Sequence, residues 1–238
     1  MKLLAIESSG MVASVAILSD NQLLTEYTVD YKKTHSQTLL PMIDEIVKMT
    51  EFDLNTLDAI AVSSGPGSFT GLRIGSATAK GLGLALQKPI IEVPTIEGLA
   101  FQYQGCEYVV CPLMDARRSQ VYTGAYTFHG SEPEVLWKQS AVAIEEAIQK
   151  VNAIGEKTIF LGDGVPVHEE KLKSMVEVPY FIAPAHMNRQ RAGAVADAAL
   201  LRMKQGFLVD ARDHQPEYLR LSQAEREMAK KKEMQKYE

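Results

Sequence analysis

Residues 2–29, KLLAIESSGMVASVAILSDNQLLTEYTV, contain three apolar stretches separated by short polar turns. The first stretch ends at Glu7, and Ser8, Ser9 and Gly10 form the turn that follows it. Compact runs rich in Val, Ile, Thr and Tyr, bounded by turn residues, are typical of β-strands. The sequence therefore predicts three consecutive strands joined by tight turns, with an acidic residue at the end of the first strand.

The hydrophobic period then changes to that of a helix. A first helix is expected from Thr34 onward, and a second helix follows the glycine-rich sequence GPGSFTG at residues 65–71. Apolar runs between and after these helices predict two more strands. The expected elements are a helix from residue 34, a strand at 58–63, a helix at 71–86, a strand at 89–93 and a short helix at 95–104.

The second half of the chain repeats this order with little sequence identity. Its first apolar run ends at Asp115, in the place that Glu7 holds in the first half. Its last apolar run ends at Gly162, in the place of Gly65. The expected elements are strands at 108–114, 120–128 and 135–139, a helix at 141–151, a strand at 158–161 and a helix at 188–205. The order predicts the α/β, duplicated ribonuclease H-like fold of actin, sugar kinases and heat-shock chaperones, in which two βββαβα lobes surround a cleft.

The repeat also predicts the domain organisation. We expect an N-terminal lobe at residues 1–104, a C-terminal lobe at residues 105–221 and a charged tail at residues 222–238. Charged residues and helix formers make up nearly all of the tail, which is compatible with either a solvated helix or a disordered segment.

Composition excludes several classes of protein. The 238 residues carry 30 Asp and Glu against 25 Lys and Arg, a net charge of −5, which is unsuited to a stand-alone binder of the nucleic-acid backbone. Two cysteines are too few for a disulfide scaffold or a four-thiolate zinc site, and they fit a reducing cytoplasm. No run approaches the roughly 20 apolar residues of a membrane span. We therefore expect a cytoplasmic protein without membrane contacts.

Six residues are candidates for a site in the predicted cleft. Two strand-end acids would face each other there, and phosphate chemistry needs a carboxylate near a hydrated metal and small residues that let backbone N–H groups approach. The alternatives are a plain β-turn, an acid paired with a neighbouring arginine, and an exposed solubilising side chain. The candidates are Glu7, Ser8, Ser9, Arg73, Asp115 and Arg117.

The glycine-rich sequence at residues 65–71 has two interpretations. It precedes a helix, whose N-terminus offers free N–H groups to an anion. However, it lacks the Gly-Lys-Ser/Thr ending of a P-loop, so no lysine reaches a terminal phosphate. The sequence therefore favours a tight structural turn that admits close backbone packing.

Small residues line one face of the helix that follows. Gly71, Gly75, Ala79 and Gly83 lie four apart. A glycine inside a helix costs about 1 kcal/mol relative to alanine, so close packing must compensate. Such a stripe lets another helix backbone come very near.

At this point four stretches together resemble the bacterial TsaB family, also called YeaZ. The resemblance runs from residue 1 to about residue 220, and its glycine-rich stretch is long and specific. The stretches are THSQTLLP at 34–41, GPGSFTGLRIG at 65–75, DAR at 115–117 with Val121 and Tyr122, and PEYLR at 216–220.

The resemblance implies a role in forming N6-threonylcarbamoyladenosine beside the anticodon of tRNA. In that family's pathway TsaC makes threonylcarbamoyl-AMP, TsaD transfers the group, TsaE is an ATPase, and the TsaB-type subunit supports TsaD. It implies a non-catalytic scaffold that forms a heterodimer with TsaD, works with TsaE, and meets TsaC and tRNA indirectly. It implies no cofactor of the chain's own, with ATP or ADP bound either in the cleft or at the interface of the complex.

The resemblance also implies that no metal site forms. TsaD-like proteins carry two metal-binding histidines in an N-H-x-E-G-H segment, and the matching positions here are Thr95 and Leu99. A hydroxyl and an aliphatic group cannot replace two imidazoles as ligands. Two enzyme alternatives stay open beside the scaffold: a small ATP phosphotransferase that uses Glu7 and Asp115, and a metallopeptidase of the TsaD-related class.

The resemblance implies, finally, that the small-residue helix packs against its partner's equivalent helix in a bundle. The first helix supplies more of this surface, which would also form a homodimer when TsaD is absent. The expected interface residues are Leu39, Leu40, Ile43, Val47, Gly71, Leu72, Ile74, Gly75, Thr78, Ala79, Leu82 and Gly83.

Overall fold

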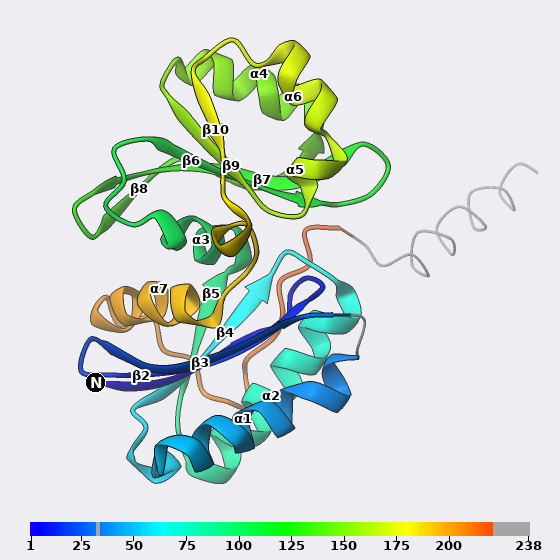
Figure 1. Ribbon diagram of the computed structural model, residues 1–238. Coiled ribbons are helices and arrows are strands. Elements are labelled where there is room, and N and C mark those ends of the chain that lie inside the picture. Colours follow the sequence, from blue (N-terminus) through cyan, green and yellow to red (C-terminus); the bar gives the residue numbers. More distant parts are fainter. Residues whose placement is uncertain (32–33, 221–238) are drawn as a thin grey trace, which may run out of the picture.

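The chain forms two sheets of five strands each in a computed structural model that describes residues 1–31 and 34–220 (Figure 1). The first sheet has the order β3-β2-β1-β4-β5. β1 is buried along almost its whole length and pairs antiparallel with β2 and parallel with β4. Its strands are β1 (Lys2–Glu7), β2 (Val12–Ser19), β3 (Gln22–Asp30), β4 (Ala59–Gly65) and β5 (Ile90–Pro94).

The second sheet repeats this plan, with the order β10-β9-β6-β7-β8. β6 takes the place of β1, because it pairs antiparallel with β7 and parallel with β9. Its strands are β6 (Val109–Asp115), β7 (Gln120–His129), β8 (Glu132–Ala143), β9 (Thr158–Leu161) and β10 (Tyr180–Ile182). Equal strand order and equal pairing directions confirm the predicted duplicated ribonuclease H-like fold.

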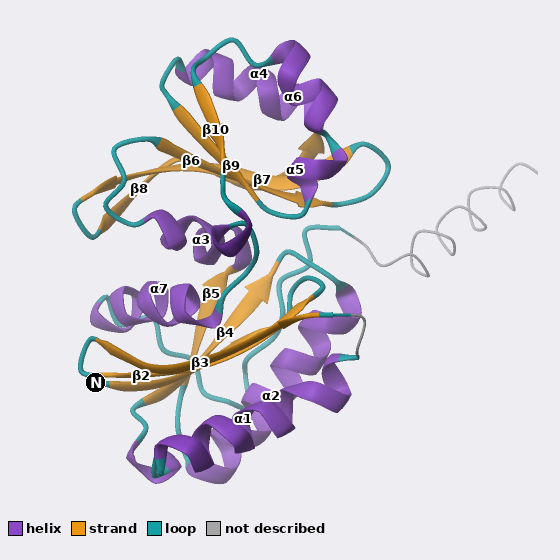
Figure 2. Cartoon of the chain, in the orientation of Figure 1, coloured by secondary structure: helices purple, strands orange, loops and turns teal. Residues whose placement is uncertain are grey.

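Helices cover both faces of the first sheet (Figure 2). α1 (His35–Thr50) and α2 (Phe69–Leu86) lie on the outer face, and the short helices α3 (Thr95–Ala100) and η2 (Phe101–Tyr103) lie on the side of the other lobe. Two-sided cover explains why β1 and β4 are almost wholly buried. Further helices are η1 (Leu54–Thr56), α4 (Ile144–Ile154), α5 (Gly164–Val167), α6 (Glu169–Met175) and η3 (Ala185–Met187).

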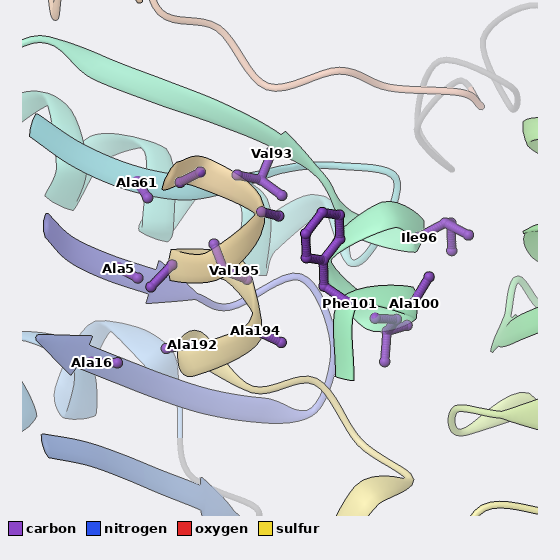
Figure 3. Close-up of a cluster of buried hydrophobic side chains, with 14 of the residues drawn as sticks. Ala5, Ala16, Ala61, Val93, Ile96, Ala100, Phe101, Ala192, Ala194 and Val195 are labelled. Atoms are coloured by element: carbon purple, nitrogen blue, oxygen red, sulfur yellow. The ribbon is translucent and has the colours of Figure 1, made fainter. Parts of the chain in front are cut away.

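The last helix, α7 (Ala192–Lys204), departs from the expected division at residue 105. It packs against β1, β2 and β5 of the first sheet and against α3, so residues far along the chain complete the first lobe (Figure 1). Its small side chains allow this, since they are buried on nearly every side. Figure 3 shows Ala192, Ala194 and Val195 in the same cluster as Ala5 and Phe101.

The chain stays with the first lobe after α7. Val209 pairs with Ile90 at the start of β5, and the buried Ala211 joins the core beneath α1 and α2. No helix within residues 1–31 and 34–220 is long and apolar enough to cross a membrane. The charged tail predicted at residues 222–238 lies outside the described residues.

Candidate functional site between the lobes

Each lobe carries the same acidic turn at the end of its central strand. Glu7 ends β1, and its Oε1 accepts a hydrogen bond from the backbone N–H of Ser9 at 2.6 Å. Asp115 ends β6, and its Oδ1 accepts from the backbone N–H of Arg117 at 2.9 Å. The two acids therefore have equivalent places and equivalent partners, which supports the pairing predicted from the sequence repeat.

Glu7 nevertheless faces the interior of the first lobe. It is 1% exposed, and it also accepts hydrogen bonds from the hydroxyls of Ser9 and Ser63. Burial raises the pKa of this carboxyl, and the hydrogen bonds oppose that rise only in part. Ser8 is buried as well, and its hydroxyl donates to the carbonyl oxygen of Gly71 at 2.9 Å. Glu7 and Ser8 thus do not line the cleft, contrary to the sequence-based expectation.

A cleft of about 450 Å³ does lie where the turns of both lobes meet. Three of the six predicted residues line it, namely Ser9, Asp115 and Arg117. The other lining residues are Gly10, Met11, Gly67, Ser68, Phe69, Met114, Ala116, Tyr122, Asp163, Glu217, Tyr218, Leu219 and Arg220.

Asp163 is a cleft residue that the sequence analysis did not single out. It accepts a hydrogen bond from the backbone N–H of Asp115 at 3.0 Å. Burial raises the pKa of its carboxyl, and the neighbouring charge of Asp115 adds to the rise. Its position in the sequence Gly162-Asp163-Gly164, at the end of β9, was the available signal, because Gly162 matches Gly65.

Arg117 and Arg73, the two arginines predicted for the cleft, both contact side chains of the same chain. Arg117 forms an ion pair with Asp115 at 3.2 Å, but its side chain is 86% exposed, so the pair contributes little to stability. Arg73 lies outside the cleft lining, where its guanidinium stacks over the Phe69 ring at 4.0 Å and its Nε donates to the hydroxyl of Tyr218 at 3.3 Å.

The glycine-rich turn between β4 and α2 is used for packing within the chain. The backbone N–H of Ser68 donates to the carbonyl oxygen of Ser9 at 2.6 Å, and a Cβ on Gly67 would lie 2.3 Å from that oxygen. The Ser68 hydroxyl accepts from the N–H of Gly71 and caps α2. This arrangement confirms the interpretation as a tight structural turn.

The same contacts bear on whether the cleft could bind the phosphates of ATP or ADP, the nucleotides that the fold class implies. A phosphate would need free backbone N–H groups at these turns. Those of Ser9, Ser68, Gly71 and Arg117 all donate within the chain. These four N–H groups are therefore not available to a phosphate, and we assign no nucleotide chemistry to the cleft.

The small-residue stripe of α2 faces inward. A Cβ on Gly71 would lie 2.1 Å from the carbonyl oxygen of Ser8, and one on Gly75 would lie 2.2 Å from the Ser8 hydroxyl. A Cβ on Gly83 would lie 2.8 Å from the Ala211 Cβ. The close approach expected of a partner helix is thus made by this chain's own first turn and C-terminal segment.

Most of the predicted interface is covered for this reason. The covered residues are Leu39, Ile43, Gly71, Leu72, Gly75, Ala79 and Gly83. The others remain at least partly accessible, with Leu40 57% exposed and Val47, Ile74, Thr78 and Leu82 half-buried.

A second, outward stripe appears on the same helix. Ala77, Gly81 and Ala85 lie four apart and are exposed, and in the part of the chain that the structure describes no atom lies within 4 Å of a Cβ added to Gly81. Leu84 beside them is 50% exposed. α1 lies alongside α2 and adds Leu40 and the exposed Pro41 (Figure 1). We call these six residues the outer face.

Thr95 and Leu99, at the two histidine positions of TsaD-like proteins, lie one turn apart on α3 and are both buried. The Thr95 hydroxyl has no hydrogen-bond partner among residues 1–31 and 34–220. In the described part of the chain, no three His, Cys, Asp or Glu side chains gather in a group that could hold a metal ion.

Comparison with known proteins places the chain in a family. The family model described as TsaD, tRNA N6-adenosine threonylcarbamoyltransferase, matches residues 22–228. A Bacillus subtilis protein named tRNA threonylcarbamoyladenosine biosynthesis protein TsaB is 30% identical over 225 residues, which cover 94% of this chain and 96% of that protein. The chain belongs to the TsaB (YeaZ) family.

Other members agree with this assignment. The TsaB protein of Escherichia coli K12 is 33% identical over 151 residues, covering 60% of this chain and 64% of its own. The structure of YeaZ from Pseudomonas aeruginosa superposes with a TM-score of 0.78 at 27% identity, over 92% of this chain and 99% of that one. At 9% identity and a TM-score of 0.50, component A of (R)-2-hydroxyglutaryl-CoA dehydratase from Acidaminococcus fermentans shares the fold alone.

Proposed function

We propose that this chain acts in N6-threonylcarbamoyladenosine formation on tRNA as an accessory subunit. It binds TsaD, supports the transfer that TsaD carries out, and performs no transfer itself. The similarity to a protein named TsaB along almost the full length of both chains carries the proposal. TsaE, TsaC and tRNA join through the complex that TsaD organises.

The outer face supports the choice of docking site. The side chain of Leu40 is 57% exposed and that of Leu84 is 50% exposed. Large apolar side chains that gather on an exposed surface mark interaction sites. Ala77, Gly81 and Ala85 present almost no side chain, so a partner helix can approach the α2 backbone closely. The same face would form a homodimer when TsaD is absent.

A charge placed on this face tests the proposal. Ala77→Arg should abolish co-purification with TsaD, because it adds a long charged side chain where close approach is needed. Ala153→Arg is the matched control, since Ala153 is an exposed alanine on α4 of the other lobe. The wild-type chain and the control should raise tRNA modification by TsaC, TsaD and TsaE, and Ala77→Arg should not. Unchanged TsaD binding by Ala77→Arg, or modification that is as fast without this chain, would contradict the proposal.

A further inference from the structure

Part of the C-terminal segment lines the cleft between the lobes. Residues 217–220 form one of its walls, and Figure 1 shows this segment rising alongside α2 to the space between the two lobes. Its start is fixed on the first lobe at the buried His214, whose Nδ1 lies 2.6 Å from Oε1 of Glu92. Lys80 strengthens this anchor, because its ammonium donates to the carbonyl oxygen of His214 at 3.0 Å.

The segment then crosses the glycine-rich turn of the first lobe. The backbone N–H of Glu217 donates to the carbonyl oxygen of Ser64 at 2.6 Å. A Cβ on Gly65 would lie 2.1 Å from the carbonyl oxygen of Glu217, and Gly65 has a φ of +124°. Glycine at this position therefore lets the segment pass. Beyond it, the Tyr218 ring packs on Phe69, with ring centroids 4.6 Å apart.

The segment also bonds to the second lobe. The guanidinium of Arg220 donates to the carbonyl oxygen of Ala116, in the turn that follows Asp115. Gln139 on β8 donates to the carboxylate of Glu217 at 3.1 Å and to the carbonyl oxygen of Gly65 at 3.4 Å. A five-residue stretch thus holds the acidic turn of one lobe and the glycine-rich turn of the other.

We propose that the chain's own residues 216–220, the strap, cross-link the two lobes along one wall of the cleft. The strap joins the two turns through its hydrogen bonds to Ser64 and Ala116, beside the direct bond from Gln139 to Gly65. The strap thereby sets the separation of the lobes, and it does so whether or not the proposed function is correct.

Hydrogen exchange of the full-length chain tests this assignment. In Arg220→Ala, the amides of residues 64–71 and 115–120 should exchange about tenfold faster, as expected when a hydrogen bond to a charged group is lost. Tyr218→Ala should have the same effect at residues 64–71. Amides of the central strands β1 and β4 should keep their wild-type rates, which shows that the variants remain folded.

Arg212→Ala is the matched control. Arg212 is an exposed arginine a short distance before the strap, and its contacts with Lys80 and Asp210 are made by its backbone. The control should exchange as the wild type does, and Arg220→Lys should restore part of the protection. Unchanged exchange at both turns in Arg220→Ala and Tyr218→Ala would overturn the proposal, as would an equal acceleration in Arg212→Ala.

Discussion

Replacing Gly71 by alanine should destabilise the protein, although alanine is the better helix former. The new Cβ would lie 2.1 Å from the carbonyl oxygen of Ser8, whereas ordinary contacts begin near 3.4 Å. The backbone must therefore shift by about 1.3 Å at a turn that two hydrogen bonds hold in place, from Ser9 N–H to Glu7 and from the Ser8 hydroxyl to Gly71. Neither group has free space in which to move, because Ser8 and Ser9 are fully buried.

The expected magnitude follows from two opposing contributions. Overpacking costs about 1–3 kcal/mol, and a backbone-to-backbone contact belongs at the upper end of that range. The helix propensity of alanine returns about 1 kcal/mol. We expect Gly71→Ala to lower the free energy of unfolding by about 2 kcal/mol, which for a chain of this length lowers the Tm by roughly 4–8 °C.

Gly81→Ala on the same helix is the control. No atom of the described residues lies within 4 Å of its added Cβ, so only the propensity gain of about 1 kcal/mol remains and the Tm should rise by roughly 2–4 °C. Scanning calorimetry of both variants measures the difference. A Gly71→Ala variant as stable as the wild type would refute the reasoning, and so would a Gly81→Ala variant that loses stability.

Two further predictions concern the buried turn after β1. Gly75→Ala should cost about 1 kcal/mol by overpacking against the Ser8 hydroxyl. In a double-mutant cycle with Ser8→Ala, most of this cost should disappear in urea unfolding, and a coupling energy near zero would contradict the contact. Glu7 has a raised pKa, so the native state binds the extra proton and stability should fall as pH rises from 4.5 through the folded-state pKa. Glu7→Gln should remove that slope in denaturation curves recorded from pH 4 to pH 8, and an unchanged slope would show that another group is responsible.

Local sequence patterns predicted the duplication and most of the elements, but not α5, α6 or β10. Alternating and helical periods depend on which side of an element is buried, and strand-end acids and glycine turns repeat at matching places in both halves. Glu7 and Asp115 were paired correctly on this basis. The family resemblance was likewise carried by continuous stretches such as residues 65–75, and the comparisons confirm it.

Only the tertiary structure decided which residues each helix face and the cleft contact. Periodicity shows that Gly71, Gly75 and Gly83 share one side of a helix, but not that the side meets Ser8 and Ala211 of the same chain. The placement of α7 in the first lobe, and of residues 216–220 in the cleft, could not be read from the sequence for the same reason. Each depends on contacts between residues far apart in the chain, and such contacts form when whole layers pack together, which no local pattern records.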